Sequence, residues 1–279
     1  MKITVLVENV TTEDFLAEHG LSLFIEYKDK TYLLDAGQTD CFMENANKLG
    51  IDLSGVSCAF LSHGHYDHAG GFAAFIEKNK EMKIYAMEDI VGRYFSNKGG
   101  MHEIGVPKEV YPQLAPNFEL INSVTQVSEG VYLVPHSIQG LDKIGERTGL
   151  FKMENGAVVP DDFRHEISLV LEEPDGLVII NSCSHGGVIN IISEVKNVFV
   201  GKRIKAFVGG LHMMGMRNGE EYCTFSDDEI NEMSEFLEKE NVDKIYTGHC
   251  TGLVGYEKLR TSLCEEKVEY LLIGKIISI

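Results

Sequence analysis

Short apolar runs separated by polar turns dominate the first third of the chain and predict β-strands. Residues 3–7 are rich in β-branched side chains, and residues 21–34 contain two apolar stretches around the polar turn at 28–30. The second pattern predicts a hairpin. A helical spacing of apolar residues follows at 39–49, and the continuous apolar run at 56–61 predicts a strand that is buried on both faces.

The second half of the chain alternates strand and helix patterns. Residues 167–171 and 177–180 flank a Pro-Asp-Gly turn, which predicts another hairpin. Ser226 and Glu229 have the spacing of a capping box, so a helix is expected to begin there. The remaining expected elements are a helix near 187–199 and strands at 204–208 and 244–246.

Residues 92–160 interrupt this alternation, because they contain five of the six prolines and many glycines. We expect them to form an insertion over one edge of the core, acting as a lid that selects substrate, rather than a separate domain. The chain is therefore expected to be a single α/β domain over residues 1–279, with a lid-like insertion at about 92–160.

Composition limits the possible partners. The chain has 279 residues and a formal net charge of −18, which disfavours electrostatic binding to a nucleic acid polymer or to an anionic membrane. Its six cysteines are scattered and do not suggest a disulfide framework. Without a signal-peptide pattern or a membrane-spanning run, we expect a soluble, cytoplasmic protein with a small-molecule substrate. The oligomeric state does not follow from the sequence.

Histidine follows four of the expected strands, each time in a turn that contains glycine or serine. Loops at strand ends are where a rigid sheet can gather distant side chains. The histidines in these turns are His63, His65, His68, His185, His212 and His249.

The densest of these turns has three histidines and one aspartate within six residues. If the segment is locally extended, His63, His65 and Asp67 point to the same side. Two imidazoles suit one borderline-soft ion, while Asp67 and His68 suit a second ion beside it. We predict two divalent ions, zinc in the first place and iron or manganese as alternatives.

One turn cannot complete two coordination spheres, so distant residues are expected to join it. His249 is the candidate for the second ion and His185 for the first, with Cys183 an open alternative ligand. For His212 three roles stay open: a contact to a substrate oxygen, a general acid, or a group that fills a polar gap. Asp35 is expected to brace a ligand histidine rather than bind metal.

Two cations about 3.5–4 Å apart make a hydroxide nucleophile available near neutral pH and clamp the oxygen of the electrophile. The sequence contains no G-x-S-x-G nucleophile motif, no G-x-G-x-x-G motif after a strand, and no phosphate-binding G-x-x-x-x-G-K-[ST] motif. Metal-dependent hydrolysis is therefore the predicted chemistry, with Asp67 and His212 as the catalytic candidates.

The chain resembles the metallo-β-lactamase superfamily in several motifs. The H-x-H-x-D-H motif stands at 63–68, and residues 33–37 and 248–249 resemble the early Asp-x-Gly turn and the last histidine of the superfamily. A narrower branch, related to the dihydropterin-methyl-(ribofuranosyl)aminobenzene-phosphate synthases of methanopterin biosynthesis, is similar at additional stretches. These stretches are 18–22, 35–38, 62–68, 183–185 and 247–252.

The resemblance implies a four-layer αββα sandwich with metals at one edge, between the sheets. It also implies metal-dependent hydrolysis of an ester, thioester, amide or phosphoester, and a role for His19 near the metals or the substrate. This chain departs from the superfamily where Asp161 or Asp162 stands near the usual third-motif histidine, and Cys183 near the fourth-motif carboxylate. His185 is expected to fill one of these positions.

Three functions remain in competition. The first is a dinuclear hydrolase acting on a small, phosphate-bearing nucleotide- or pterin-like substrate. The second is a pterin-linked synthase or transferase of the methanopterin type, as the branch suggests. The third is a metal-dependent nucleotide-binding protein without turnover.

Overall fold

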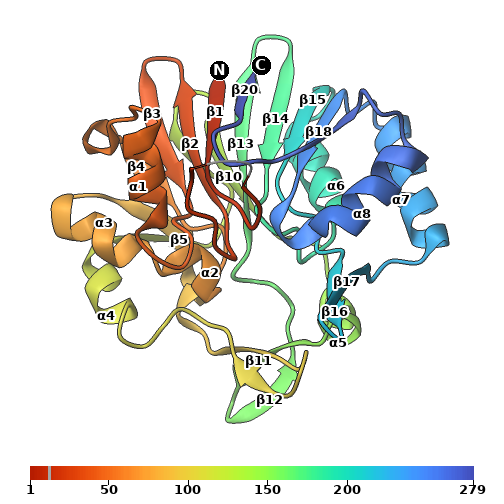
Figure 1. Ribbon diagram of the computed structural model, residues 1–279, viewed down its shortest axis with the longest axis horizontal. Coiled ribbons are helices and arrows are strands. Elements are labelled where there is room, and N and C mark those ends of the chain that lie inside the picture. The colour runs from red at the N-terminus through yellow and green to blue at the C-terminus, as the bar shows by residue number, and fades with distance from the viewer. Residues whose placement is uncertain (12–13) are drawn as a thin grey trace. The chain divides into compact units, whose positions relative to one another are not determined.

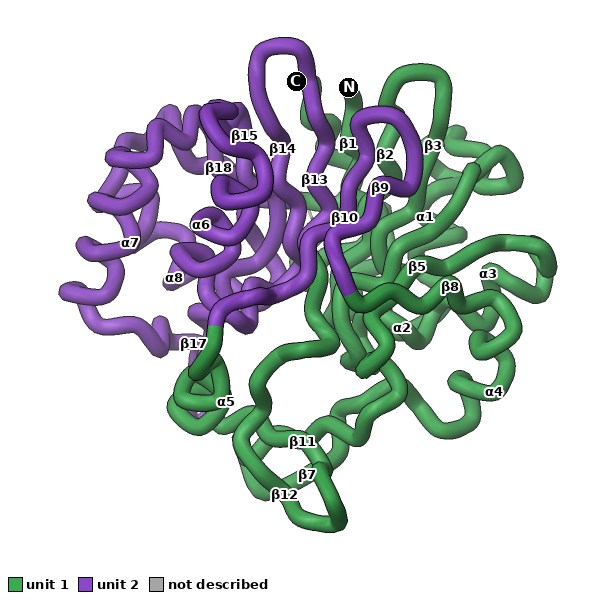
Figure 2. The backbone as a smooth tube through the Cα atoms, turned by 180° about the vertical axis from the view of Figure 1, so that it is seen from behind, with its two compact units in different colours: residues 1–122, 139–167, 272–279 green, residues 123–138, 168–271 purple. Residues whose placement is uncertain are grey.

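The computed structural model describes residues 1–11 and 14–279. The described residues form two compact units, which Figure 2 shows in different colours. Unit 1 comprises residues 1–122, 139–167 and 272–279, and unit 2 comprises residues 123–138 and 168–271. Each unit is therefore assembled from segments that are separated in the sequence.

Unit 1 is built on a seven-stranded sheet (Figure 1). The order across it is β20 (Ile276–Ser278), β1 (Lys2–Val7), β2 (Ser22–Tyr27), β3 (Lys30–Leu34), β4 (Cys58–Phe60), β5 (Ile84–Met87) and β8 (Phe118–Ile121). β2 and β3 form the predicted antiparallel hairpin. β3, β4, β5 and β8 run parallel to one another, and β4 is fully buried, as its continuous apolar run predicted.

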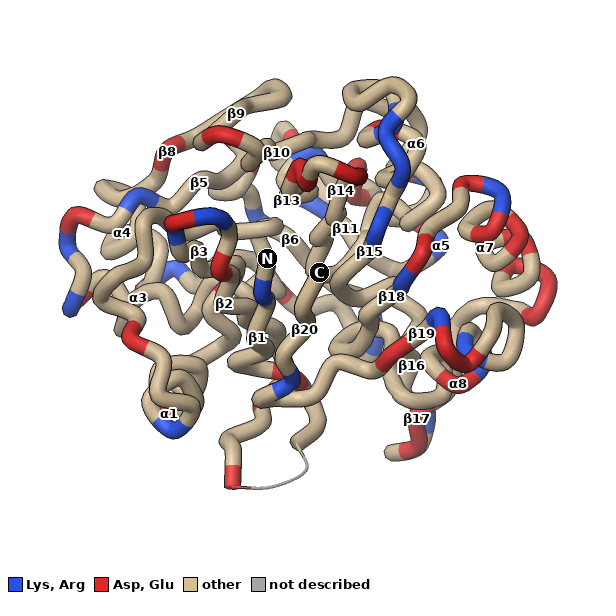
Figure 3. Tube along the Cα trace, turned by 90° about the horizontal axis from the view of Figure 1, so that it is seen from above, with Lys and Arg blue, Asp and Glu red and all other residues tan. Residues whose placement is uncertain are grey.

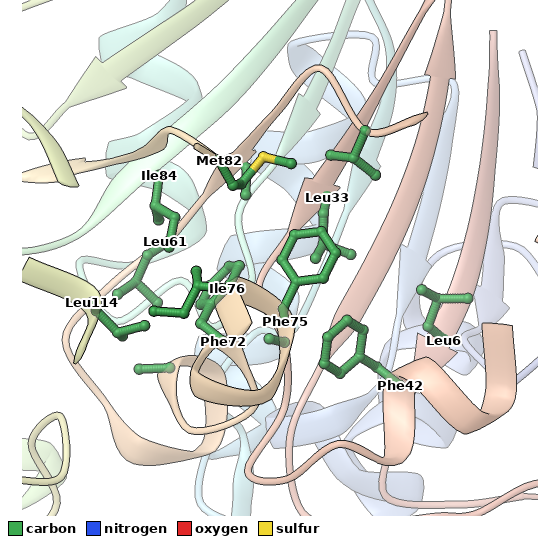
Figure 4. Close-up of a cluster of buried hydrophobic side chains, with 14 of the residues drawn as sticks. Leu6, Leu33, Phe42, Leu61, Phe72, Phe75, Ile76, Met82, Ile84 and Leu114 are labelled. Carbon is green, nitrogen blue, oxygen red and sulfur yellow. The ribbon is translucent and has the colours of Figure 1, made fainter. Parts of the chain in front are cut away.

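The hydrophobic core of unit 1 lies between this sheet and its helices. The helices of unit 1 are α1 (Cys41–Lys48), α2 (Tyr66–Ala69), α3 (Phe72–Lys78), α4 (Tyr111–Leu114) and α5 (Asp142–Thr148), with 3-10 turns at Leu53–Gly55, Glu88–Val91 and Ala115–Asn117. Phe42 of α1 and Phe75 of α3 pack edge to face, with ring centroids 5.9 Å apart. Figure 4 shows both rings beside Leu33 and Leu6 of the sheet. This burial fixes the two helices against the sheet.

Unit 2 holds a second seven-stranded sheet. Its order is β19 (Val268–Tyr270), β18 (Lys244–Thr247), β15 (Ile204–Val208), β14 (Gly176–Ile180), β13 (Ile167–Glu173), β10 (Val131–Pro135) and β9 (Thr125–Ser128). β13 and β14 are the predicted hairpin, and β14, β15, β18 and β19 are parallel neighbours. A two-stranded ribbon, β16 (Met214–Arg217) and β17 (Glu220–Cys223), completes the strands of this unit.

Three longer helices pack on the apolar core of unit 2. They are α6 (Val188–Val198), α7 (Asp227–Lys239) and α8 (Gly252–Ser262), and a 3-10 turn at His249–Thr251 precedes α8. Ser226 and Glu229 form the predicted capping box at the start of α7. Ile230 and Leu237 of α7 are buried, while its outer face is acidic, as the red segments of Figure 3 show.

The segment at 92–160 contributes to several sheets. It supplies β8 to the first seven-stranded sheet and β9 and β10 to the second. It also provides all four strands of a separate sheet in unit 1, whose order is β12 (Ala157–Pro160), β11 (Leu150–Glu154), β6 (Tyr94–Ser96) and β7 (His102–Glu103). Its role as a lid stays a prediction. Within the described residues, no helix has both the length and the apolar character needed to cross a bilayer.

Candidate functional site

The parallel strands β3 and β4 of unit 1 both end at the histidine-rich turn. Asp35 follows β3 directly, and Ser62 and His63 follow β4. Since parallel neighbours end at the same edge of a sheet, this pairing brings the Asp35 carboxylate to the turn. The Ser62 backbone N–H donates to Asp35 Oδ1 at 2.8 Å, which fixes the contact.

The prediction of a locally extended segment is correct only as far as His65, whose backbone is extended. The helix α2 begins at Tyr66, so the prediction that Asp67 points to the same side by strand alternation was wrong. The Tyr66 backbone N–H donates to the Ile104 carbonyl, and the His68 N–H donates back to the His65 carbonyl. The first bond anchors the start of α2 and the second closes its first turn, which puts Asp67 and His68 on helical geometry.

Three imidazoles meet in this turn. The ring centroid of His63 lies 4.6 Å from that of His65 and 4.2 Å from that of His68. All three side chains are buried, and ligand atoms of Asp35, His63 and His68 lie within 4.8 Å of one another. Three converging buried imidazoles are more than packing requires, and they are the donors that zinc, iron and manganese sites use.

Asp35 orients two of these rings. Its Oδ2 lies 2.8 Å from His68 Nδ1 and accepts from the Ser62 hydroxyl at 2.7 Å. The Ser62 Oγ also lies 2.8 Å from His63 Nδ1. Because the hydroxyl has one proton and the carboxylate only accepts, Ser62 donates to Asp35 and accepts from His63 Nδ1–H. Both rings thus carry a proton on Nδ1, and Nε2 of His63 keeps its lone pair.

The three histidines differ in protonation. Burial, together with the neighbouring His68 and His65, lowers the pKa of His63 well below its ordinary value. Burial likewise lowers the pKa of His65 to about 3. Burial also acts to lower the pKa of His68, but Asp67 and Asp35 outweigh it and raise that pKa to about 10. These surroundings favour the neutral form of His63 and His65 and the protonated form of His68, whose Nε2 proton a bound metal ion would replace.

Asp67 lies between a buried and an exposed histidine. Its Oδ2 is 3.5 Å from His68 Nε2 and 3.3 Å from His19 Nε2, and the His19 side chain is 43% exposed. The segment that carries His19 is held by its neighbour Glu18, which accepts from the backbone N–H groups of Gln38 and Thr39. His19 is therefore the member of this cluster that solvent reaches.

Unit 2 brings three further predicted loops together, at the ends of the parallel strands β14, β15 and β18. The Gly210 backbone N–H donates to the Ser182 carbonyl, and the Ser184 hydroxyl donates to the Gly210 carbonyl. The Leu211 N–H donates to Thr251 Oγ1 at 2.8 Å. These bonds join the 181–187, 209–212 and 247–252 loops of unit 2.

Several side chains on these loops are held by an unusual backbone. His212 and His249 have positive φ values of 51° and 49°, and Ser184, between Cys183 and His185, has 52°. A left-handed conformation costs a residue with a side chain roughly 1–2 kcal/mol, and such strain clusters at functional sites. The rings of His185 and His212 meet at 4.4 Å between centroids.

Cys183 and His249 are both buried in unit 2. The thiol of Cys250, the residue after His249, lies 3.5 Å from the Cys183 carbonyl oxygen. The roles of Cys183, His185, His212 and His249 stay predictions.

Two buried histidine–carboxylate pairs escaped the sequence reasoning. In unit 1, His165 Nε2 lies 3.0 Å from Asp161 Oδ2. In unit 2, His136 Nδ1 lies 2.7 Å from Glu194 Oε2. The His165–Asp161 pair could have been suspected, because Asp161 stands near the position where the superfamily has its third-motif histidine. For His136 and Glu194 the sequence carried no such signal, because neither residue stands in a motif.

The unit 1 cluster fits a divalent ion. His63 and His65 are neutral, as metal-ligating imidazoles must be, and the Nδ1 hydrogen bonds of His63 and His68 direct Nε2 toward the ligand position. His68 Nε2 faces the carboxylate of Asp67. The residues of unit 1 that would hold metal are His63, His65, Asp67 and His68.

Comparison with known proteins agrees with this chemistry. The family model of the metallo-beta-lactamase superfamily matches residues 17–201. The 7,8-dihydropterin-6-methyl-4-(beta-D-ribofuranosyl)-aminobenzene-5'-phosphate synthase of Methanocaldococcus jannaschii is 30% identical over 293 residues, which cover 99% of this chain and 96% of that protein. A second, uncharacterized protein of the same organism is 27% identical over 280 residues, covering 99% and 100% of the two chains.

Solved structures are similar over the whole chain. Tm1679, a metal-dependent hydrolase of the beta-lactamase superfamily, has a TM-score of 0.83 and 27% identity, and the match covers 100% of this chain and 99% of that one. Zn(2+)-bound PqqB from Methylobacterium extorquens has a TM-score of 0.62 at 11% identity, with both chains fully covered. The second likeness concerns the fold alone. Together the matches confirm the predicted fold.

Proposed function

Because this chain belongs to the metallo-β-lactamase superfamily, we propose that it is a dinuclear metal-dependent hydrolase of a small, phosphate-bearing pterin- or nucleotide-like molecule. The convergence of three buried imidazoles with Asp67 and Asp35 carries this proposal. Burying so many titratable groups together costs desolvation free energy, which bound divalent ions would offset.

In this proposal His63, His65, Asp67 and His68 are metal ligands. Asp35 and Ser62 keep the rings of His68 and His63 in the tautomer that leaves Nε2 for the metal. Divalent ions, when bound, lower the pKa of a water ligand toward neutrality and polarise an oxygen of the substrate. This supply of positive charge is compatible with an acidic chain acting on an anionic substrate.

His19 and His212 are the proposed contacts to substrate. His19 is exposed to solvent and 3.3 Å from Asp67, so a proton that leaves or reaches the substrate can pass through its ring. His212 keeps its strained backbone next to His185. His185 and His249 remain the predicted ligands from unit 2, with Cys183 as the alternative, and zinc is the proposed metal.

Metal analysis combined with an activity panel tests the proposal. We expect about two metal ions per wild-type chain and turnover of a phosphoester. We expect D67A to fold, to lose one ion and to lose nearly all turnover, because Asp67 is a ligand that His68 and His19 both contact. D228A, which removes an exposed carboxylate on α7, is the matched control and should behave as wild type.

Less than one metal ion per wild-type chain would contradict the proposal. So would a D67A variant with full metal content and full turnover. Parallel measurements on H185A, H249A and C183A would test the three predicted ligands of unit 2, since only true ligands should lower the metal content.

The full-length similarity to a pterin-related synthase favours a second candidate function. A pterin-linked synthase would form product only when a pterin diphosphate and an aminobenzene ribotide are both supplied. A hydrolase would instead act on one phosphoester alone. Tight nucleotide binding without turnover in either assay would favour the third function, a metal-dependent binding protein.

A further inference from the structure

The turn that carries His63 and His65 is tied to a distant segment of unit 1. The Gly64 backbone N–H, between the two histidines, donates to His165 Nδ1 at 2.9 Å. The Ile167 backbone N–H donates to the Ser62 carbonyl at 2.8 Å. The two bonds hold the turn on both sides of His63, although the partners are about a hundred residues apart in sequence.

The hydrogen bonds of His165 define its protonation. A ring nitrogen that accepts from a backbone N–H carries no proton, so the proton of His165 is on Nε2. That nitrogen donates to Asp161 Oδ2 at 3.0 Å, and Asp161 Oδ1 accepts from the Phe163 backbone N–H at 2.9 Å. His165 is thus a neutral imidazole that uses both nitrogens.

This arrangement excludes His165 as a metal ligand. Ligand atoms of His65, Asp161 and His165 lie within 4.8 Å of one another, which by distance alone resembles a metal site. An imidazole that binds metal through Nε2 while accepting at Nδ1 would have to lose both protons. Its contacts therefore assign His165 to holding the backbone of Gly64.

An aromatic ring closes the other side of the turn. Tyr94 packs on His165 with ring centroids 3.9 Å apart and an interplanar angle of 38°. A Cβ placed on Gly64 would lie 2.9 Å from Tyr94 Cε2 and 3.0 Å from the Ile90 carbonyl oxygen. Tyr94 and the Ile90 carbonyl therefore leave no room for a side chain at 64, and the backbone there has little freedom to move.

We propose that His165, held by Asp161, is a positioning residue: its Nδ1 fixes the Gly64 amide and thereby the spacing of the His63 and His65 imidazoles. Only the expected effect of His165 on metal affinity rests on the proposed function. Asp161 and Tyr94 hold the ring of His165 in place, and the side chain of His165 need not touch metal or substrate.

Two substitutions separate the hydrogen bonds of His165. H165N places an amide oxygen where Nδ1 stands, so it keeps the acceptor for Gly64 and gives up the Asp161 contact. H165Q extends an amide N–H toward Asp161 and gives up the acceptor. Backbone hydrogen exchange of Gly64 in the metal-free protein and the Kd for Zn²⁺ are the two readouts, and H102N, at an exposed histidine of β7, is the control.

We expect H165Q to lose the exchange protection of Gly64 and to bind Zn²⁺ about 10–100-fold more weakly, the usual cost of removing a group that orients a ligand. H165N should keep both properties close to wild type. The amides of the central strand β2 report whether a variant is folded, so loss at Gly64 with β2 still protected is a local effect.

The reverse pattern would overturn the proposal: protection kept in H165Q and lost in H165N would assign the role to the Asp161 contact. Equal Zn²⁺ affinity in H165Q and wild type would also overturn it. If wild type binds no Zn²⁺, the proposed function fails, whereas the exchange of Gly64 still decides whether His165 holds the turn.

Discussion

In both units a buried carboxylate holds a loop and a histidine, and the carboxylates Asp35 and Glu194 differ in their surroundings. Asp35 in unit 1 accepts from the Ser62 backbone N–H and hydroxyl and from His68 Nδ1. Glu194 in unit 2 accepts from the backbone N–H groups of Ser137 and Ile138, at 2.5 and 2.8 Å, and from His136 Nδ1. The same arrangement, a carboxylate that accepts from loop amides and from an imidazole, is thus found in both units.

Their neighbours set the two pairs apart. His68 faces a second carboxylate, Asp67, and packs on the ring of His63, whereas His136 has Glu194 as its carboxylate and packs on Gly186, where a Cβ would lie 2.4 Å from its Nε2. A histidine–carboxylate pair is therefore a general way to fix a loop. In the proposed function, Asp67 and the imidazoles around His68 are what make that pair part of a metal site.

The largest effect is expected from removing the unit 1 carboxylate. D35A leaves the Ser62 amide, the Ser62 hydroxyl and the His68 ring without their acceptor inside the protein. We expect the free energy of unfolding to fall by about 3–5 kcal/mol, the usual cost of breaking a buried charged pair. Urea unfolding at neutral pH measures this loss.

D35N is the matched control, because asparagine tolerates the positive φ of 57° at this position and can still accept one hydrogen bond. We expect it to retain more stability than D35A. Equal stability of D35A and wild type would show that Asp35 does not hold the turn.

A smaller effect, with a pH dependence, is expected at Glu194. Burial acts to raise the pKa of this carboxyl, but the hydrogen bonds from His136 and from the 137–138 amides outweigh it and lower the pKa. A depressed pKa in the folded state stabilises the protein above the ordinary value of 4.5, and this stability is lost as the pH falls through the folded-state pKa.

At pH 7 the free energy of unfolding of E194Q should therefore be about 1–3 kcal/mol lower than that of wild type. This difference in the free energy of unfolding should become smaller as the pH falls below 4.5. E232Q, at an exposed glutamate of α7, should show neither effect. A gap between E194Q and wild type that stays constant from pH 7 to pH 3 would argue against the charge of Glu194 as its cause.

The smallest effect compares glycine with alanine. At His212, with φ 51°, H212G should be more stable than H212A by about 1–2 kcal/mol, because glycine relieves the left-handed backbone. His63 has no positive φ, so H63A should be more stable than H63G by roughly 0.5–1 kcal/mol. Urea unfolding of the four variants checks the reversal, and the same order at both positions would refute the role of strain.

Sequence reasoning predicted best where local chemistry decides the structure. The turns at 28–30 and 174–176 and the capping box at Ser226 define their elements by themselves, and the structure confirms all three. The 63–68 motif was recognisable because its residues are contiguous. The helical start at Tyr66 was not, since α2 has four residues and depends on a hydrogen bond to Ile104.

The residues that support the candidate site could not be predicted, because their contacts join segments far apart in the sequence. His165 reaches Gly64 across about a hundred residues, and His136 reaches Glu194 across 58, so no local periodicity carries either contact. The positive φ of His212 and His249 is likewise imposed by the loops around them. What holds the candidate site in place is tertiary structure.

The pairing of β1 with β20 has a consequence for synthesis in the cell. β1 (Lys2–Val7) leaves the ribosome long before β20 (Ile276–Ser278), the strand that covers its outer edge. Until translation reaches that point, one side of β1 exposes unsatisfied amide and carbonyl groups, which favour intermolecular association. Nascent chains stalled before β20 should therefore depend on chaperones more than chains that include β20.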